Sequence, residues 1–298
     1  MSARWALWPW LAVGVTVLSF AWWHSARTPH PPPPDGGVAN VAFSLAGRPG
    51  QITLRRILTP ADFDRLGTAP SDDFDIDGGG RVVFADAGTV FALVPTERAV
   101  LAVPLAHVAG LRGVAVDGSD ALLLLTASSL SGYRGGAVQS LLPFPAGAPI
   151  SRIAGSVDRR RVYLYGSAAL DGTFAHRVVE ISADGTVRSL VEVDEPVTAV
   201  TDVAGSLYFA TMHAIYRWHD AHLQVVIRLP SAVRVRSIAA APGVLYFSTD
   251  DEVYALKGLV AVSIVRRLGG AVRSYRGSLY VLDARRKCLV QLNGMQYL

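Results

Sequence analysis

Residues Ser206–Thr211 read S-L-Y-F-A-T, and close copies follow at Val244–Thr249 (V-L-Y-F-S-T) and Ser278–Asp283 (S-L-Y-V-L-D). Weaker copies stand upstream, at Arg81–Asp86 (R-V-V-F-A-D), Ala121–Thr126 (A-L-L-L-L-T) and Arg161–Gly166 (R-V-Y-L-Y-G). Successive copies start 40, 40, 45, 38 and 34 residues apart. A repeat of this length with an apolar, β-branched and aromatic centre is typical of an array of strand units. We interpret the six strings as the second strands of six propeller blades.

Each string lies among further strand-like segments. An apolar stretch and a tight turn rich in Gly and Asp come before it, and two more apolar stretches follow it. The sixth repeat lacks its fourth strand, whereas Gln51–Leu58 (Q-I-T-L-R-R-I-L) resembles the fourth strand of the fifth repeat. We expect Gln51–Leu58 to pair with Cys288–Leu292, because joining the chain ends removes exposed strand edges. The predicted fold is all-β, a six-bladed β-propeller closed by its N-terminal strand; the residue count leaves little room for a seventh, degenerate blade.

The stretch V-A-V-D-G-S-D-A-L-L-L-L-T at 114–126 resembles the first strand, Asp turn and second strand of the NHL, YWTD and gluconolactonase-like (TolB-like) propellers. The resemblance covers about residues 50–298 and implies the same fold. That group contains lactonases, strictosidine synthase-like enzymes and binding modules, so it does not imply one function. Its lactonase-type enzymes hold a metal with Glu, Asp and Asn side chains in the channel. The only asparagines here are Asn40 and Asn293, so that metal site is not expected.

Composition supports a globular core and argues against several functions. Hydrophobic residues make up 51% of the chain, charged residues 17%, and the net charge is +4. The basic residues fall in short, separate runs, so the sequence lacks the concentrated basic face of a nucleic-acid binder. Cys288 is the only cysteine, which rules out an intrachain disulfide, and its apolar surroundings predict a buried, inert thiol.

The N-terminal segment predicts a membrane anchor. Residues 6–23 carry no charge and are about long enough to span a bilayer, with tryptophans at both ends. We expect an anchor or signal segment over 1–28, a Pro/Gly-rich linker over 29–39 and the propeller over 40–298. The propeller would then be extracytoplasmic, on a single-pass helix in the cell membrane. Small residues at Ser19 and Ala21 leave open the alternative of a cleaved signal and a secreted protein.

Two possible metal sites are weak. Asp73, Asp75, Asp77 and Gly78 match the front half of a calcium loop, but Phe84 stands where a bidentate Glu is needed. A strand that enters a Gly-rich turn is the favoured interpretation. The histidines at 213, 219 and 222 lack the spacing of a closed zinc set and are expected at opposite ends of one blade. No catalytic motif, metal or cofactor is predicted.

The face that carries the turns between second and third strands is the predicted binding surface. One of these turns, Gly166–Ala175, is longer than the others and is interpreted either as a contact loop or as a tolerated insertion. The residues expected to project there follow the core strings directly; they are Asp86, Asp171, His213, Asp250, Asp251, Arg285, Arg286 and Lys287. Their mixed charge favours a polar partner, a protein or a glycan.

The favoured function is therefore a non-catalytic binding or scaffolding module; the alternative is a lactonase or hydrolase with its site in the central channel. The two predict different channels. An enzyme should have inward-facing carboxylates with perturbed pKa values. A binding module should have a channel of Ala, Val and Ser with charge at the rim, and first strands such as I-A-A-A at 238–241 favour this second arrangement.

Overall fold

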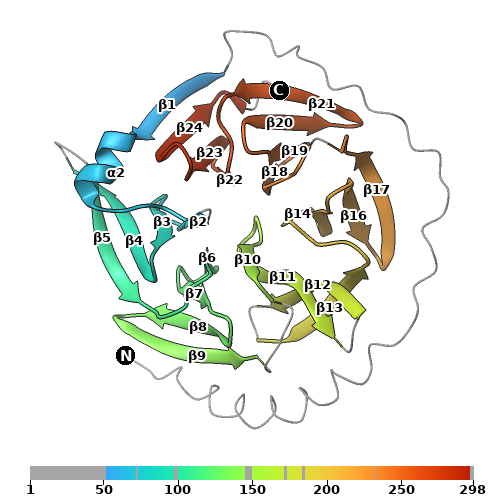
Figure 1. Cartoon of the computed structure of the whole chain (residues 1–298), viewed down its shortest axis with the longest axis horizontal. Helices are drawn as coiled ribbons and strands as arrows, with labels where there is room; N and C mark the ends of the chain where they lie inside the picture. The colour runs from blue at the N-terminus through green and yellow to red at the C-terminus, as the bar shows by residue number, and fades with distance from the viewer. Residues whose placement is uncertain are drawn as a thin grey trace, which may run out of the picture. The chain divides into compact units, whose positions relative to one another are not determined.

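The structure is a computed structural model that describes residues 52–71, 73–96, 100–144, 150–170, 173–182, 185–231 and 233–295. Within them the chain forms six antiparallel four-stranded sheets and one short helix (Figure 1). The predicted membrane segment, the linker and the start of the predicted propeller domain lie outside these residues. Of the helices in the described ranges, none has the length and apolar content needed to cross a membrane.

The six sheets are the blades. They are numbered along the chain, and the strands of each blade are given from the channel outward. Blade 1 contains β2 (Phe74–Ile76), β3 (Val82–Asp86), β4 (Thr89–Pro95) and β5 (Val100–His107). Blade 2 contains β6 (Gly113–Val116), β7 (Leu122–Leu125), β8 (Ser129–Arg134) and β9 (Ala137–Pro143). Blade 3 contains β10 (Arg152–Gly155), β11 (Arg161–Leu170), β12 (Thr173–Ser182) and β13 (Val187–Val193).

The second half of the ring repeats this arrangement. Blade 4 contains β14 (Ala199–Val203), β15 (Ser206–Ala210), β16 (Ala214–His219) and β17 (His222–Arg228). Blade 5 contains β18 (Ser237–Ala241), β19 (Val244–Ser248), β20 (Glu252–Lys257) and β21 (Val260–Arg266). Blade 6 contains β22 (Ala271–Tyr275), β23 (Ser278–Asp283), β24 (Cys288–Asn293) and β1 (Thr53–Leu58).

The first strands contact one another in cyclic order, from β2 through β6, β10, β14 and β18 to β22 and back to β2. The sheets therefore close into a ring, and the predicted six-bladed propeller is confirmed. Each of the six repeated strings forms the second strand of its blade, as the sequence predicts.

The predicted closure of the ring is also confirmed. Strand β1 pairs antiparallel with β24, with Thr53 opposite Asn293 and Leu58 opposite Leu289. Blade 6 therefore takes three strands from the end of the chain and one from near its beginning. Its outer edge is formed by a segment more than two hundred residues away in sequence from its neighbour.

An aromatic pair recurs at one position of the second and third strands in blades 1, 4 and 5. Phe84, Phe209 and Phe247 stand at the fourth position of their strings, and each lies opposite an aromatic residue of the third strand. The ring pairs are stacked, with centroids 5.5 Å apart for Phe84–Phe91, 5.2 Å for Phe209–Tyr216 and 4.9 Å for Phe247–Tyr254. Cross-strand aromatic pairs of this kind stabilise a sheet beyond the area that they bury.

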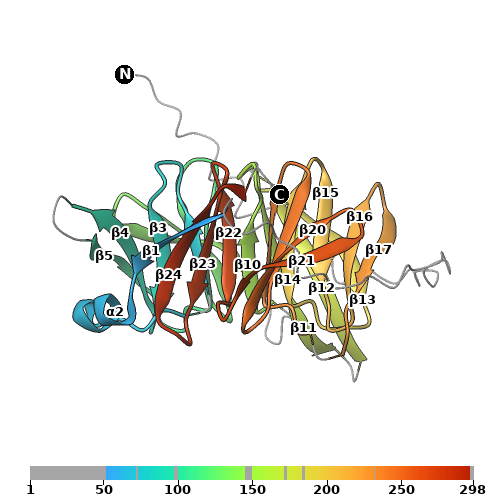
Figure 2. The same cartoon turned by 90° about the horizontal axis from the view of Figure 1, so that it is seen from above.

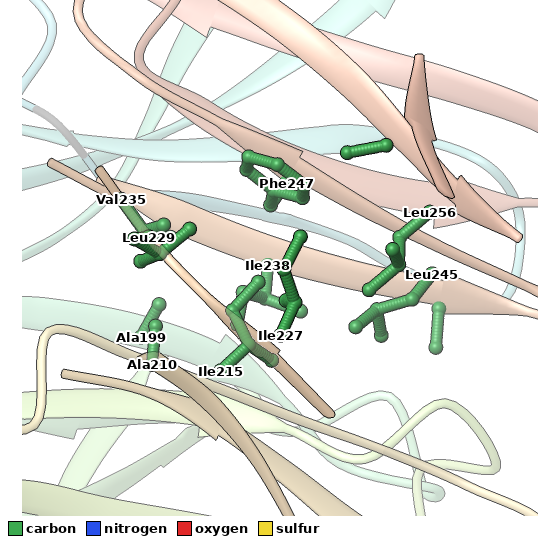
Figure 3. Packing of buried hydrophobic residues seen from close by; sticks show 12 residues of the cluster. Ala199, Ala210, Ile215, Ile227, Leu229, Val235, Ile238, Leu245, Phe247 and Leu256 are labelled. Carbon is green, nitrogen blue, oxygen red and sulfur yellow. The ribbon is translucent and has the colours of Figure 1, made fainter. Parts of the chain in front are cut away.

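The core is divided among the faces where neighbouring blades pack. Between blades 4 and 5, for example, Ile215 and Ile227 of one blade pack with Ile238 and Phe247 of the next (Figure 3). All four side chains are buried. Each blade therefore depends on its neighbours to bury its apolar faces, as expected for a repeat architecture.

Two elements differ from the sequence prediction. The long loop expected at Gly166–Ala175 is a strand extension, because β11 and β12 stay paired from Gly166↔Arg177 out to Leu170↔Thr173. The second difference is α2 (Pro60–Leu66), a helix that the sequence analysis did not predict. It follows β1 at the rim of the ring, where Figures 1 and 2 show it next to that strand.

Candidate functional site

A cavity lies at one end of the central channel of the propeller. It has a volume of about 510 Å³. Its lining comes from the ends of first strands and from the turns that follow them, in blades 1, 3, 5 and 6, with Val200 and Thr201 from blade 4. The cavity therefore opens on the face that carries the turns between first and second strands. This is the face opposite to the predicted binding surface.

One wall of this cavity is made of small side chains. Ala154 and Gly155 of blade 3 and Ala239, Ala240 and Ala241 of blade 5 contribute to the lining. This side confirms the expectation that small residues of the first strands line the channel. It leaves room for a ligand close to the backbone of the inner strands.

Another wall of the cavity is charged, which the sequence analysis did not expect. Arg273 lies in the first strand of blade 6, and its Nη2 is 3.2 Å from Asp73 Oδ1 of blade 1. Its Nε is 3.8 Å from Asp75 Oδ1. The three side chains are 15–18% exposed, so this ion-pair cluster is largely withdrawn from solvent. The Arg273 guanidinium also lies over the ring of Phe74, 5.6 Å from its centroid.

The two carboxylates lie there because they bind the free edge of the neighbouring blade. Asp73 Oδ2 accepts the Val114 N–H at 3.0 Å, and Asp75 Oδ2 accepts the Val116 N–H at 2.8 Å. Both amides belong to β6, the inner strand of blade 2, whose channel side has no strand partner. An unpaired buried N–H costs about 1–3 kcal/mol, so these bonds stabilise the junction of blades 1 and 2.

Burial sets the protonation of this pair. Removal from water raises the pKa of Asp73 to about 7, against the opposing charge of Arg273 and the Val114 hydrogen bond. The pKa of Asp75 is raised for the same reason, again opposed by Arg273. The channel thus contains a carboxyl group that titrates near neutral pH.

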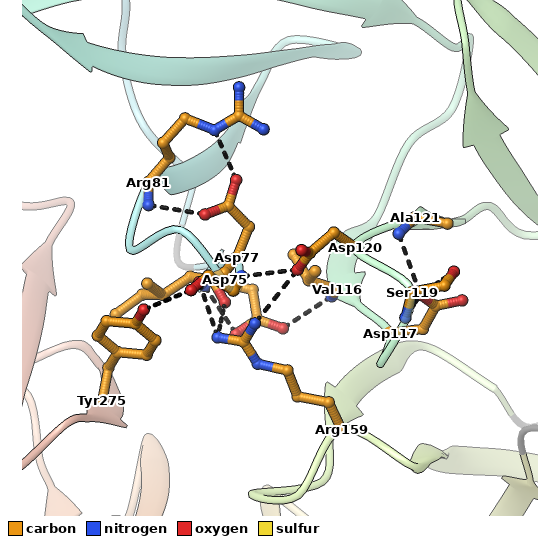
Figure 4. A network of polar contacts seen from close by, with 12 residues as sticks. Asp75, Asp77, Arg81, Val116, Asp117, Ser119, Asp120, Ala121, Arg159 and Tyr275 are labelled. Carbon is orange, nitrogen blue, oxygen red and sulfur yellow. Dashed lines mark hydrogen bonds and ion pairs between the residues drawn. The ribbon is translucent and has the colours of Figure 1, made fainter.

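Arg159 crosses the mouth of the channel from the first turn of blade 3 (Figure 4). Its Nη2 donates to the carbonyl oxygens of Ile76 at 2.7 Å and Asp77 at 2.8 Å. Its Nη1 is 3.3 Å from Asp120 Oδ1, and the same oxygen accepts the Gly78 N–H at 2.6 Å. A Cβ on Gly78 would lie 2.8 Å from Asp120 Oδ2, so a larger residue there would displace the Asp120 carboxylate. These bonds connect the turns of blades 1, 2 and 3.

Tyr275 completes the charged wall. Its hydroxyl donates to the Gly78 carbonyl at 2.7 Å. The guanidinium of Arg159 lies 5.4 Å from the ring centroid, and that of Arg276 lies 5.1 Å from it. Arg276 is exposed at the mouth, and its Nη2 has one long hydrogen bond to Gly78 O at 3.4 Å.

Four of the eight residues predicted from sequence gather at the junction of blades 5 and 6. Arg286 Nη2 is 2.6 Å from Asp251 Oδ1, and its Nη1 is 2.7 Å from Asp283 Oδ2. Asp250 is 3.1 Å from Arg236 and 4.0 Å from Arg285. We call Asp250, Asp251, Arg285 and Arg286 the blade 5–6 patch.

The other predicted residues do not join this patch. Asp86 accepts the Ala69 N–H at 2.9 Å. His213 Nδ1 is 3.1 Å from Glu195, and Lys287 Nζ is 2.8 Å from Asp64 of α2. Asp171 lies outside the described residues. The eight positions therefore do not form one continuous site.

The possible metal sites have other roles in the structure. Phe74–Ile76 is a strand that runs into a Gly-rich turn, as predicted. Asp77 accepts the Arg81 N–H and pairs with the Arg81 guanidinium, so its carboxylate is already bonded within the turn. His213 lies in the turn between β15 and β16, whereas His219 and His222 lie at the opposite end of blade 4. No group of three or more His, Cys, Asp or Glu suited to hold a metal occurs within the described ranges.

Asn293 is hydrogen-bonded and Cys288 is partly buried. Asn293 Oδ1 accepts the Ser278 hydroxyl at 2.8 Å, and Asn40 lies outside the described residues. Cys288 is partly buried, and burial raises the pKa of its thiol, which agrees with the predicted low reactivity.

The channel residues were missed although the sequence contains a signal for them. The first strand of blade 1 has Asp75 and that of blade 6 has Arg273, whereas the first strand of blade 5, S-I-A-A-A, has no charged residue. Opposite charges at inner-strand positions of two blades that meet in the ring indicate an ion pair across the channel side. Recognising it requires the ring closure first, because Asp73 and Arg273 are two hundred residues apart.

Comparisons with solved structures support the fold. A gluconolactonase from Xanthomonas campestris superposes with a TM-score of 0.64 at 15% identity, over 90% of this chain and 99% of that one. Virginiamycin B lyase from Staphylococcus aureus gives 0.58 at 10% identity, over 81% and 99%. A chain of the nidogen/laminin complex gives 0.55 at 17% identity, over 68% and 85%. At these identities the likeness establishes the propeller architecture and not the activity.

The sequence itself gives no closer assignment. No model of a protein family matches it, and neither does any curated protein sequence.

Proposed function

We propose that this protein is a non-catalytic binding or scaffolding module, held outside the cytoplasm by an N-terminal membrane helix, for a protein or glycan partner. The fold is compatible with this, because similar propellers include both enzymes and a chain of the nidogen/laminin protein complex. The blade 5–6 patch is the observation that carries the proposal.

The patch offers charges of both signs in a fixed arrangement. Asp250, Asp251 and Arg285 are 46%, 62% and 61% exposed, so their polar atoms are available to a partner. Arg286 anchors the group because it also binds the buried Asp283 and the Asp250 carbonyl at 3.2 Å. Hydrogen bonds to Asp251 and Asp283 raise the pKa of Arg286 further above its usual range, so its charge is constant. Side chains already held in place lose less entropy on binding than free ones.

The test is a pull-down with the anchored protein and a charge-reversed patch. Asp250→Lys, Asp251→Lys and Arg285→Glu change the exposed charges, while Arg286 is kept because Asp283 would otherwise be buried without its partner. Partners that bind through the patch should be lost. Arg134→Glu with Arg188→Glu, at exposed positions of other blades, is the control and should retain them. If the patch variant keeps every partner, this surface is not the binding site.

The location is tested separately. The uncharged segment 6–23 and the proline-rich spacer after it support an extracytoplasmic propeller on a membrane anchor. Protease added to intact spheroplasts should then digest the propeller. Digestion only after lysis would place it inside the cell, and release of the propeller into the medium would favour signal cleavage.

A hydrolase or lactonase in the channel is the second candidate, and Asp73 is the observation in its favour. A carboxylate with a pKa of about 7 is well placed to take a proton from an attacking water at neutral pH. Against it, Asp73 already accepts from Val114 and pairs with Arg273. Hydrolysis of sugar lactones that falls at least a hundredfold in Asp73→Asn would support the enzyme, on the scale of general-base catalysis. No turnover by the unaltered protein, or turnover that survives the substitution, removes this role.

A further inference from the structure

We propose that the mouth of the central channel, on the face of the first turns, binds a small organic anion through Arg276, with Tyr275 and the alanine wall enclosing it. This site is distinct from the blade 5–6 patch and opens on the opposite face. Its volume of about 510 Å³ is in the usual range for small-molecule sites, roughly 300–1,000 Å³.

Three arginines line the cavity, and two of them are paired with carboxylates. Arg273 is paired with Asp73 and Asp75, and Arg159 is paired with Asp120. Arg276 forms no ion pair with any carboxylate among the residues described, although it lines the cavity. An anion that enters would therefore supply a missing partner instead of displacing an existing one.

The contacts that orient the Arg276 side chain involve few of its N–H donors. Arg276 has a φ of 46° in the turn between β22 and β23, which directs the residue away from the extended path of the strand. Its guanidinium lies against the Tyr275 ring, and within the described residues its one side-chain hydrogen bond is the long contact with Gly78 O. A guanidinium has five N–H donors in one plane, so a bidentate bond to a carboxylate or phosphate stays available.

The rest of the wall suits the organic part of such a ligand. Tyr275 is fixed by its bond to the Gly78 carbonyl and presents an aromatic surface beside the guanidinium. In the neighbouring blade 5, Ala239, Ala240 and Ala241 give the lining small apolar side chains. A flat or compact ligand can thus bury apolar surface while its charged group stays at the mouth.

Binding should strengthen as the pH falls through neutrality. Asp73 precedes β2 and faces Arg273 of β22, Asp75 of β2, Arg152 of β10 and Tyr165 of β11. When Asp73 is protonated, the negative charge facing Arg273 is reduced and the channel becomes more positive. The pKa of about 7 places this change between pH 6 and pH 8.

The test is calorimetric titration of the full-length protein with a panel of small carboxylates, each matched with its uncharged amide. At least one carboxylate should bind while its amide does not. Arg276→Gln should weaken that binding about tenfold or more, as expected for a charged hydrogen bond. Arg160→Gln, an exposed arginine outside the cavity lining, is the matched control and should change nothing.

The pH dependence is the second measurement. Affinity should rise severalfold from pH 8 to pH 6, and Asp73→Asn should remove this rise while binding persists. The proposal is overturned if no carboxylate binds more tightly than its amide, or if Arg276→Gln leaves the affinity unchanged. Because the blade 5–6 patch is untouched in these variants, partner binding and anion binding succeed or fail independently.

Discussion

Asp73 is a hydrogen-bond acceptor at a largely buried position, where an ionised carboxylate is poorly hydrated. It must present an ionised or neutral oxygen to the Val114 N–H, and it must do so in a place that water reaches poorly. The cost of burying a charge is expressed in its pKa, which rises to about 7 from an ordinary 3.8. The folded protein therefore binds a proton that the unfolded chain releases over this interval.

The first prediction follows from that difference. Asp73 contributes stability that is present below about pH 4 and is lost as the pH rises to about 7, at up to roughly 1.4 kcal/mol per pH unit. Asp73→Asn keeps an acceptor for Val114 and cannot titrate, so its free energy of unfolding should fall less over this interval. Urea unfolding at pH 4.5, 5.5 and 6.5 measures the effect. Parallel curves for the two proteins would contradict the assigned pKa.

At the scale of single elements, α2 is held by local bonds at its first turn. Thr59 Oγ1 accepts the Asp62 N–H at 3.3 Å, and Asp62 Oδ2 accepts the Thr59 N–H at 2.8 Å. Pro60 begins the helix, and Gly67 ends it with a φ of 66°. The single fully buried side chain of the helix, Phe63, meets Phe84 edge-on at 5.9 Å.

The second prediction tests this cap. Thr59→Ala removes the side-chain acceptor and should lower the free energy of unfolding by about 1 kcal/mol. Thr59→Ser keeps the hydroxyl and should stay close to the unaltered protein. Chemical denaturation of the three proteins is sufficient. Equal losses in the two variants would mean that the methyl group, and not the cap, stabilises this segment.

Strand β1 has a larger role than its length suggests, because it covers the outer edge of β24. The third prediction is that deletion of residues 38–58 exposes this edge and promotes aggregation. Deletion of residues 38–50 keeps β1 and serves as the control. Size-exclusion chromatography should show aggregates for the longer deletion only. A monomeric and equally stable longer deletion would argue against the closure role.

These elements also show what the sequence could and could not predict. The six strings fixed the second strands, because a short apolar and aromatic run between turns has few other interpretations. The T-P-A-D-F stretch at 59–63 contains a helix cap, but it stands alone outside the repeats and was not recognised. The pairing of β11 with β12 beyond Gly166 depends on backbone bonds that composition does not specify. The channel cluster depends on which blades become neighbours, which is a property of the closed ring.

At the scale of the molecule, every blade packs against two others, and the first strands form an uninterrupted circle of contacts. A loss of packing in one blade therefore weakens the support of all. Leu58 is 1% exposed in the cluster between blades 6 and 1, and its replacement by Ala should cost about 2–5 kcal/mol.

The fourth prediction is that the loss of stability in Leu58→Ala affects all six blades. In Leu58→Ala, hydrogen exchange of the slowest amides should accelerate by the same factor in β11 of blade 3 as in β23 of blade 6, because both open in one global event. Acceleration confined to blades 6 and 1 would instead show that the blades open separately.

The carboxylates that bind the edge of the neighbouring blade limit how freely such repeats can be recombined. Asp73 and Asp75 are encoded in one repeat, but the amides that they satisfy belong to the next. Deleting or transplanting either of the first two repeats alone would separate these donors from their acceptors. The first two repeats therefore form one unit of exchange, and a chimera that divides them would need matching substitutions on both sides of the new border.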